Sequence, residues 1–282
     1  MVSPSTILRR YGLRPKKAWG QCFLNDPATV ARIIDVSDIT DTDTVIEIGA
    51  GVGTITDALA GLARRVIAIE RDRDLVAVLR NEFASASNVE IAEENALTFD
   101  YSATSDLPVK VVGNLPYNIS SPLLFHLMTH RHSVGQATLM FQRELADRIV
   151  AGPGTRAYGI PSVICQQFAD VRRCFTVSAG AFVPKPRVDS AVVLLVMREM
   201  PRSPCEDTLF QEVVRAAFRV RRKMVRNALT SRFGPDRVGQ ALAAAGLEGS
   251  RRAETLTVEE YGHLTAALAA GGAGPRCGDL TR

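Results

Sequence analysis

The sequence predicts an α/β protein in which a mostly parallel sheet wrapped by helices is followed by a smaller all-helical domain. Over residues 44–196, short apolar runs rich in β-branched side chains alternate with longer stretches of helical spacing, as in parallel strands joined by helices. Residues 207–270 are rich in Ala, Leu and Arg and contain no strand-like run. The segment PRSPCED has the composition of a linker. We therefore expect domains at residues 1–200 and 201–282, with a frayed tail at the end.

The elements of the first domain can be assigned in chain order. TVIEIGAG is a buried strand that runs into a glycine turn, and a helix follows it. RVIAIE, NVEIAEENAL and VKVVGNLPY supply the second, third and fourth strands, and the helix after the fourth has Pro122 near its first turn. QATLMFQRELADRIV is a fifth strand that passes into a helix. FTVSAGAFVPKPRVDSAVVLLVM holds two strand-like runs around a proline-rich loop, which we expect to close the sheet as a hairpin.

Composition indicates a folded protein that needs no cross-links. Of its 282 residues 46% are hydrophobic and 23% charged, which is ordinary globular usage. The apolar run Ala191–Met197 is far shorter than the roughly 20 residues of a membrane span, and the first residues lack the apolar core of a secretory signal. Five cysteines without a CxxC pair argue against a disulfide framework and a zinc site. We expect a cytoplasmic protein with no membrane segment and no metal.

Positive charge is concentrated in two segments. The net charge is +4, but residues 1–32 carry six basic side chains against one acid, and residues 215–232 carry seven against none. Such segregation favours a polyanionic partner such as nucleic acid, the alternative being two solvated basic faces. The candidate RNA contacts are Lys16, Lys17, Arg221, Arg222, Lys223 and Arg226.

The glycine turn after the first strand predicts the cofactor. EIGAGVG follows a strand and opens a helix, which is where doubly wound folds bind nucleotide ligands. A dinucleotide fingerprint anchored at Gly49 would require glycine at position 54, where this chain has Thr54. The GxGxG form is typical of S-adenosylmethionine enzymes, in which Gly49 and Gly51 would let the backbone approach the ribose and the amino acid portion.

Two side chains at the ends of the next strands extend this cofactor site. Glu70 ends the second strand, 21 residues after Gly49, where a carboxylate can accept hydrogen bonds from both ribose hydroxyls. Asn95, after the third strand, can accept a hydrogen bond from the adenine amine through its side-chain oxygen. Taken alone, Glu70 is more often a solvated strand end and Asn95 an ordinary turn residue, so both count only together with the glycines.

The loop Asn114-Leu115-Pro116-Tyr117, after the fourth strand, predicts the reaction. It matches the NxPY-type loop of enzymes that methylate exocyclic amines of bases, and a plain turn is the alternative. The adenine N6 lone pair is delocalised until hydrogen bonds to both N6 protons favour a pyramidal nitrogen. The Asn114 side-chain oxygen and a main-chain carbonyl at Leu115 or Pro116 can accept them, with the proline stiffening the loop. Placing N6 in line with the methyl group then provides most of the rate, and no strong base is required.

Aromatic side chains are expected on both faces of the target base. A base inside a stacked helix is unreachable, so it must be flipped out or presented in a loop. Tyr117 can stack on one face, and Phe182 in AFVPKPRVDSAV is the candidate for the other. Core packing is the alternative for Phe182.

The order of these motifs resembles the ribosomal RNA adenine dimethyltransferase family, and within it the bacterial small-subunit enzymes. The likeness extends from Lys16 to about Leu268 through KKAWGQCFLND, EIGAGVGTIT, VIAIERD, GNLPYNISSPLLFHL, FVPKPRVDSAVV and RRKMVRNAL. It implies a Rossmann-like S-adenosylmethionine-dependent methyltransferase domain with a small C-terminal helical domain. It also implies dimethylation of two adjacent adenines in a hairpin near the 3′ end of 16S rRNA. By family position the cofactor contacts are Cys22, Leu24, Gly49, Glu70, Asn95 and Asn114, with Tyr117 and Phe182 on either side of the base.

Two positions depart from the usual family pattern, and several functions compete. Cys22 stands where members commonly carry Asn or His, and Asn95 where they carry Asp. The rivals are a macrolide-resistance methyltransferase acting on large-subunit rRNA, a DNA adenine methyltransferase, and a non-catalytic factor that binds the immature 30S subunit. The later motifs and the NLPY loop favour the small-subunit enzyme. We expect it to act as a monomer.

Overall fold

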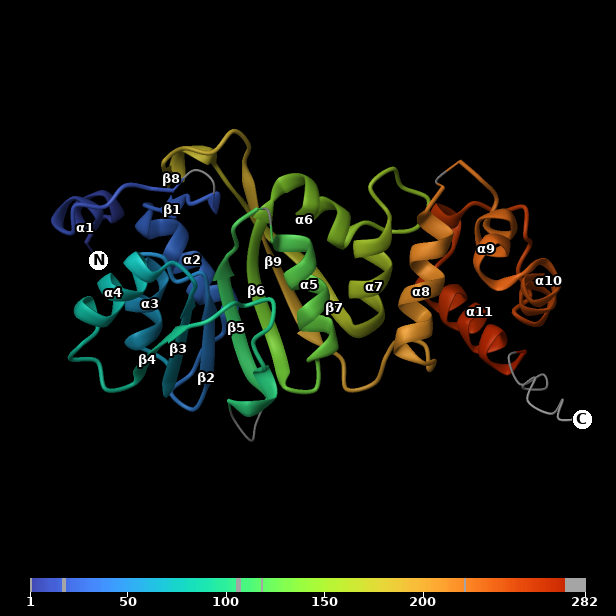
Figure 1. Cartoon of the computed structure of the whole chain (residues 1–282), viewed down its shortest axis with the longest axis horizontal. Coiled ribbons are helices and arrows are strands. Elements are labelled where there is room, and N and C mark those ends of the chain that lie inside the picture. The colour runs from blue at the N-terminus through green and yellow to red at the C-terminus, as the bar shows by residue number, and fades with distance from the viewer. Residues whose placement is uncertain (1, 17–18, 105–107, 118, 221, 272–282) are drawn as a thin grey trace, which may run out of the picture. The chain divides into compact units, whose positions relative to one another are not determined.

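The structure is a computed structural model that describes residues 2–16, 19–104, 108–117, 119–220 and 222–271 (Figure 1). The chain divides into two compact units. The first, here called the sheet unit, comprises Met1–Val150 and Ala169–Glu199, and the second, here called the helical unit, comprises Ala151–Phe168 and Met200–Arg282.

The sheet unit is built on a mixed sheet in which seven strands are described. Their order is β4-β3-β2-β5-β6-β9-β7, with parallel pairing from β4 to β6 and antiparallel pairing of β9 with both β6 and β7. The predicted α/β fold and the antiparallel pair at one end of the sheet are thus confirmed. The strands are β2 (Thr44–Ile48), β3 (Arg65–Glu70), β4 (Val89–Glu93), β5 (Val109–Asn114), β6 (Val134–Gln142), β7 (Ala169–Val177) and β9 (Ser190–Met197).

The strand order creates the place for a ligand. From β2 the chain moves outward through β3 and β4, then returns to β5 on the other side of β2. The loops that leave β2 and β5 therefore diverge at the carboxyl edge of the sheet, and such switch points are where open α/β sheets bind ligands. All five residues of β2 are buried, as expected for a central strand covered on both faces.

Helices pack along this sheet and begin at recognisable caps. The Asp26 side chain accepts a hydrogen bond from the Thr29 amide at the start of α2, and Asp72 caps α4 through the Asp74 amide. The 3-10 helices η2 (Tyr101–Ala103) and η3 (Ala179–Ala181) lie in the connections. The helices are α1 (Pro4–Arg10), α2 (Pro27–Ser37), α3 (Thr54–Ala60), α4 (Arg73–Glu82), α5 (Ser120–Thr129) and α6 (Arg143–Val150).

A second, two-stranded sheet brings the N-terminal segment beside the chain that leads into β9. Strand β1 (Phe23–Leu24) pairs antiparallel with β8 (Phe182–Val183), so that Leu24 lies opposite Phe182. Figure 1 shows the two strands side by side above the upper ends of the strands of the large sheet. Residues about 160 positions apart in the sequence are thereby neighbours.

The helical unit contains five described α-helices and no described strand within residues 200–271. Its core includes Phe210 on α8 and Tyr261 on α11, and α11 begins with a capping box between Thr257 and Glu260. The expected division at residues 200 and 201 stays a prediction. The packing units differ from it because α7 packs against α8 and α11. The helices are α7 (Ile160–Phe168), α8 (Asp207–Phe218), α9 (Val225–Phe233), α10 (Pro235–Ala244) and α11 (Val258–Ala270).

Two absences concern only the described part of the chain. None of its helices is long and apolar enough to cross a membrane. None of its His, Cys, Asp and Glu side chains gathers in a group of three or more that could hold a metal ion.

Candidate active site

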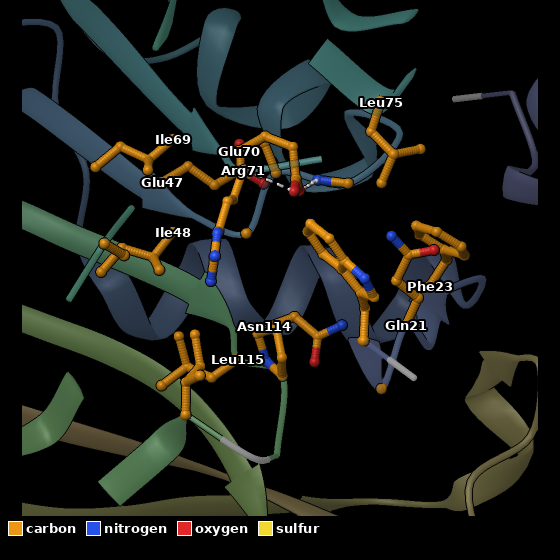
Figure 2. Close-up of a pocket in the computed structure, with 18 of the residues that line it drawn as sticks. Gln21, Phe23, Glu47, Ile48, Ile69, Glu70, Arg71, Leu75, Asn114 and Leu115 are labelled. Carbon is orange, nitrogen blue, oxygen red and sulfur yellow. Dashed lines mark hydrogen bonds between the residues drawn. The ribbon is translucent and has the colours of Figure 1, made fainter. Parts of the chain in front are cut away.

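A cavity of about 390 Å³ opens at the carboxyl ends of β2, β3 and β5 (Figure 2). Segments 19–24, 47–55, 69–71 and 114–117 supply most of its wall. The sequence-predicted residues that line it are Cys22, Leu24, Gly49, Gly51, Glu70, Asn95, Asn114, Leu115, Pro116 and Tyr117. Every residue predicted to contact the cofactor therefore borders one cavity.

The glycine turn after β2 needs its glycines. Gly49, Gly51 and Gly53 have φ of 73°, 61° and 85°, in the left-handed region that side chains disfavour. A Cβ added at Gly51 would lie 3.1 Å from the Phe23 ring. The amides of Gly49 and Ala50 both donate to the Ile69 carbonyl, at 2.9 and 3.2 Å. The turn is thus fixed against the end of β3 by its own backbone.

The Glu70 carboxylate closes this turn from the neighbouring strand. Its Oε2 accepts a hydrogen bond from the Gly51 amide at 2.9 Å, and its Oε1 accepts from the Arg71 and Asp72 amides at 2.8 and 2.9 Å. Burial raises the pKa of Glu70, while these three donors act in the opposite direction. A carboxylate has about four lone-pair positions, so room for one further donor remains without displacing an amide.

Asn95 follows β4 and borders the cavity next to Glu94. Its side-chain oxygen accepts a hydrogen bond from the Leu97 amide at 3.2 Å, and its carbonyl accepts from the Thr98 amide at 2.9 Å. The first contact fixes the amide orientation, since a backbone N–H can only donate. One lone pair of the side-chain oxygen remains for a second donor.

Asn114, the last residue of β5, is held by the backbone of the N-terminal segment. Its Nδ2 donates to the Cys22 carbonyl at 3.0 Å. A carbonyl can only accept, so the amide must turn its NH2 towards Cys22, which leaves the side-chain oxygen free to accept. Figure 2 shows the Asn114 side chain in the cavity wall. The Cys22 thiol is half-buried, and burial raises its pKa, but the contact with Asn114 uses the main chain.

The carbonyls after Asn114 are not equivalent. The Pro116 carbonyl accepts hydrogen bonds from the Ile119 amide at 3.1 Å and the Ser120 hydroxyl at 3.2 Å, because it belongs to the turn that starts α5. The buried Leu115 uses its amide, which lies 3.4 Å from the Met140 carbonyl. Of the two carbonyls that the sequence left open, the geometry therefore favours that of Leu115.

Tyr117 is anchored at the other side of the loop. Its hydroxyl lies 3.0 Å from Oγ of Ser190, the fully buried first residue of β9. Burial raises the pKa of Tyr117, so the phenol stays neutral at physiological pH. This contact fixes the edge of the ring while the side chain still borders the cavity.

Phe182 differs from its expected placement. Its side chain is only 3% exposed, packs in a hydrophobic core with Leu24, Val30 and Val192, and does not line the cavity. The reason is the β1–β8 pairing, which sets Phe182 opposite Leu24 at the edge of this core. In this structure the core-packing alternative describes Phe182.

The predicted RNA contacts fall into two groups. Lys16 lies 2.6 Å from Asp72 and 2.7 Å from Asp74, and Gln21 also donates to Asp72, so this lysine fastens the N-terminal segment to the start of α4. Hydrogen bonds to the two aspartates raise the pKa of Lys16. Arg222, Lys223 and Arg226 have exposed side chains in the helical unit, and Lys17 and Arg221 lie outside the described residues.

The residues that line the cavity without having been predicted include three with polar or aromatic side chains of note. Glu47 is buried, accepts a hydrogen bond from the Thr56 hydroxyl at 2.5 Å, and has a pKa raised by burial to about 8. Thr54 is 7% exposed, and its hydroxyl has no partner among the described residues. Trp19, the single tryptophan, is 40% exposed and lies with its ring centre 5.5 Å from the Lys16 ammonium. Glu47 and Thr54 belong to the segment that contains the glycine motif. Their polar side chains beside an apolar strand were the sequence signal that could have identified them.

The cavity suits S-adenosylmethionine. Its volume lies in the usual range for small-molecule sites, and glycine backbone and a strand-end carboxylate meet where a nucleoside binds such folds. The unpartnered Thr54 hydroxyl is a buried polar group that a polar ligand atom would satisfy. These features lie within one cavity of the sheet unit.

Comparisons with known proteins identify the family of this chain. The family model for ribosomal RNA adenine dimethylase matches residues 12–270. Ribosomal RNA small subunit methyltransferase A of Magnetococcus marinus is 43% identical over 262 residues, covering 92% of this chain and 93% of that protein. A dimethyladenosine transferase from Plasmodium falciparum has a TM-score of 0.74 at 24% identity, over 89% of this chain and 98% of that one. The 23S rRNA methyltransferase ErmE has a TM-score of 0.67 at 26% identity, over 88% and 99%. The chain therefore belongs to the ribosomal RNA adenine dimethylase family and is an S-adenosylmethionine-dependent methyltransferase.

Proposed function

We propose that this enzyme dimethylates N6 of two adjacent adenines in a hairpin near the 3′ end of small-subunit (16S) rRNA. We further propose that it acts as a cytoplasmic monomer on the immature 30S subunit. The observation that carries the proposal is the orientation of the Asn114 amide, which the Cys22 carbonyl fixes so that the side-chain oxygen can accept a hydrogen bond at the cavity. The likeness to small-subunit methyltransferases over most of the chain supports the choice of substrate.

The chain's own groups would hold the methyl donor. Glu70 would accept a ribose hydroxyl at its remaining lone pair, and a second hydroxyl would compete with the Gly51 amide. Asn95 would accept from the adenine amine, and Thr54 would hydrogen-bond the amino acid portion. Leu24 on β1 and Cys22 just before this strand would also contact the ligand. When bound, S-adenosylmethionine supplies an electrophilic methyl group on a sulfonium.

The NLPY loop would prepare the nucleophile. The Asn114 oxygen and the Leu115 carbonyl would accept hydrogen bonds from the two N6–H groups, so that the nitrogen lone pair turns towards the methyl carbon. As the new nitrogen–carbon bond forms and the sulfur–carbon bond breaks, nitrogen gains positive charge and releases a proton to water. Glu47 would not serve as the base, because its carboxyl is enclosed and hydrogen-bonded to Thr56. Positioning then supplies most of the acceleration.

The target base would stack on Tyr117, whose hydroxyl is tied to Ser190. A second aromatic at Phe182 remains a prediction, and it requires this ring to leave the core in which it packs. The exposed side chains of Arg222, Lys223 and Arg226 would contact RNA phosphates.

Transfer of labelled methyl groups to purified small subunits that lack these modifications tests the proposal, with large subunits and Asn114→Ala as controls. We expect label as N6,N6-dimethyladenine on small subunits only, and loss of label in the variant. Label on large subunits would assign the activity to the alternative that the likeness to ErmE favours. Binding without transfer would identify a non-catalytic assembly factor, the alternative that the basic segments favour.

A further inference from the structure

The loop that connects β8 to β9, residues 184–189, begins and ends beside the active site. Its last residue, Asp189, accepts a hydrogen bond from the Ala179 amide through its side chain and one from the Arg143 amide through its carbonyl, both at 3.0 Å. The next residue is Ser190, which holds the Tyr117 hydroxyl. The end of this loop is therefore fixed to the residue proposed to stack on the target base.

This loop presents two cations whose charge is not balanced by a neighbour. Lys185 and Arg187 have exposed side chains and form no ion pair within the described part of the chain. By contrast, Arg143 and Arg173 nearby both pair with Asp147, at 3.8 and 2.8 Å. The one acid of the loop, Asp189, uses its carboxylate to accept a backbone N–H.

The loop is also stiff. The two cations alternate with Pro184 and Pro186, whose rings fix φ and remove backbone donors. A stiff backbone reduces the entropy lost when the cations are ordered on a ligand. Exposed apolar surface accompanies them, because the Val188 side chain is 45% exposed.

The position of these cations indicates what they bind. An adenine that reaches Asn114 and Tyr117 would leave its sugar and its two flanking phosphates near the cavity mouth, and the loop that carries the two cations joins Ser190, which holds the Tyr117 hydroxyl. We propose that Lys185 and Arg187 hold the phosphates that flank the target adenine and so position its N6 at Asn114. This inference rests on the proposed function. It assigns the two residues a positioning role, distinct from the affinity that Arg222 and Lys223 provide.

The test compares three double variants of the full chain that each remove two positive charges. They are Lys185→Gln with Arg187→Gln in the loop, Arg222→Gln with Lys223→Gln in the helical unit, and Arg64→Gln with Arg65→Gln at the amino end of β3. The last pair lies at the opposite end of the strand from Glu70, where Arg64 donates to the Thr44 hydroxyl and Arg65 pairs with Glu90, and it serves as the control for charge removal away from the cavity. Single-turnover methyl transfer at saturating small subunits and the dissociation constant for the RNA are measured for each.

We expect the loop variant to lower the single-turnover rate roughly tenfold or more, because misplacement of a reacting group by about 1 Å has effects of this size. Its dissociation constant should rise only a few-fold. The Arg222 and Lys223 variant should weaken binding with a smaller loss of rate, and the Arg64 and Arg65 variant should stay within twofold of the wild type in both. A loop variant with the wild-type rate at saturation, or with weakened binding alone, would overturn the proposal.

A second measurement separates this inference from the proposed function. A hairpin RNA carrying 2-aminopurine at the target position reports unstacking of that base as increased fluorescence, whether or not methyl transfer occurs. The wild type should increase the fluorescence and the loop variant should not, at concentrations where both are saturated with RNA. An equal increase in both proteins would contradict a positioning role. Absence of methyl transfer by the wild type would instead count against the proposed function alone.

Discussion

The two loops at the carboxyl edge of the sheet are held in place in opposite ways. The glycine turn after β2 is fixed through its own backbone amides, because those of Gly49 and Ala50 donate to the Ile69 carbonyl and that of Gly51 donates to the Glu70 carboxylate, 19 residues away. The NLPY loop after β5 depends on two side-chain contacts, from Asn114 to a carbonyl 92 residues away and from Tyr117 to a hydroxyl 73 residues away. The glycine turn with Glu70, here called the cofactor half of the site, is thus a local property of one β–α–β unit. The catalytic half requires the assembled sheet unit, so it can be lost while cofactor binding survives.

Asn114→Ala should separate methyl transfer from cofactor binding and have the largest effect. Removing the acceptor should lower the rate of methyl transfer by roughly 10²–10³-fold, as for other preorganised hydrogen-bonding groups in active sites. Affinity for S-adenosylmethionine should fall far less than the rate, because the glycine turn and Glu70 remain, although Asn114 is itself an expected cofactor contact. Single-turnover kinetics give the first value. Fluorescence of the single tryptophan, Trp19, which borders the cavity, gives the second. A parallel loss of both values would show that the two halves are not separable.

The site residues that could be predicted from the sequence are those whose place depends on local motifs and strand order. Gly49, Gly51, Glu70 and Asn114 were found because strand order and motif spacing place them at one edge of the sheet. The contact of Asn114 with the Cys22 carbonyl could not be found, because it depends on a tertiary approach between distant segments through a main-chain atom.

Placements that depend on side-chain direction were the ones that differed. Phe182 faces the core rather than the cavity, because pairing with β1 decides which face of a two-residue strand is buried. Lys16 pairs with Asp72 and Asp74, which are distant in sequence and could not be recognised as its partners. A local sequence pattern predicts the element in which a residue lies, but it does not predict which distant residue its side chain contacts.

Gly51→Ala tests whether the cofactor half depends on its backbone. At φ of 61° an alanine costs about 1–2 kcal/mol, and its Cβ would also press on the Phe23 ring. We expect cofactor affinity to fall tenfold or more and the free energy of unfolding to fall by about 1–3 kcal/mol. Gly61→Ala is the matched control, since its φ of −78° suits alanine and a Cβ there meets no atom closer than 3.8 Å. A similar loss in both variants would contradict the argument from φ.

Glu47→Gln tests whether the buried acid of β2 has a raised pKa, through the pH dependence of the free energy of unfolding. The pKa of Glu47 in the folded protein is raised to about 8, mainly by burial, from an ordinary value near 4.5. The folded state therefore binds more protons than the unfolded state between these values. Stability from this group is complete below pH 4.5 and is lost as the pH rises through 8.

Denaturant unfolding at pH 6, 7 and 8 measures this effect. One proton corresponds to a slope of at most about 1.4 kcal/mol per pH unit, and the glutamine variant should lack that contribution. We expect the variant to gain stability relative to the wild type as the pH rises across this window. Parallel pH profiles for the two proteins would show that Glu47 titrates normally.

Asn95→Asp should increase the affinity for the cofactor, with a smaller effect than the changes above. A carboxylate can still accept the Leu97 amide that shapes the turn, and its charge strengthens a second hydrogen bond from the adenine amine. We expect the affinity for S-adenosylmethionine to rise about threefold to tenfold, measured by calorimetry, with an unchanged single-turnover rate. Unchanged affinity would restrict Asn95 to its role in the turn.

The smallest effect is expected for Cys22→Ala, although Cys22 touches both halves of the site. Asn114 donates to the main-chain carbonyl of this residue, which alanine retains, so methyl transfer and cofactor affinity should stay within about twofold of the wild type.

Asn114→Asp tests the other side of the same hydrogen bond. It keeps an acceptor for N6 but sets a carboxylate oxygen against the Cys22 carbonyl, and its rate should fall at least tenfold. Loss of activity in Cys22→Ala with retention in Asn114→Asp would reverse this assignment, because the thiol would then hold the catalytic loop.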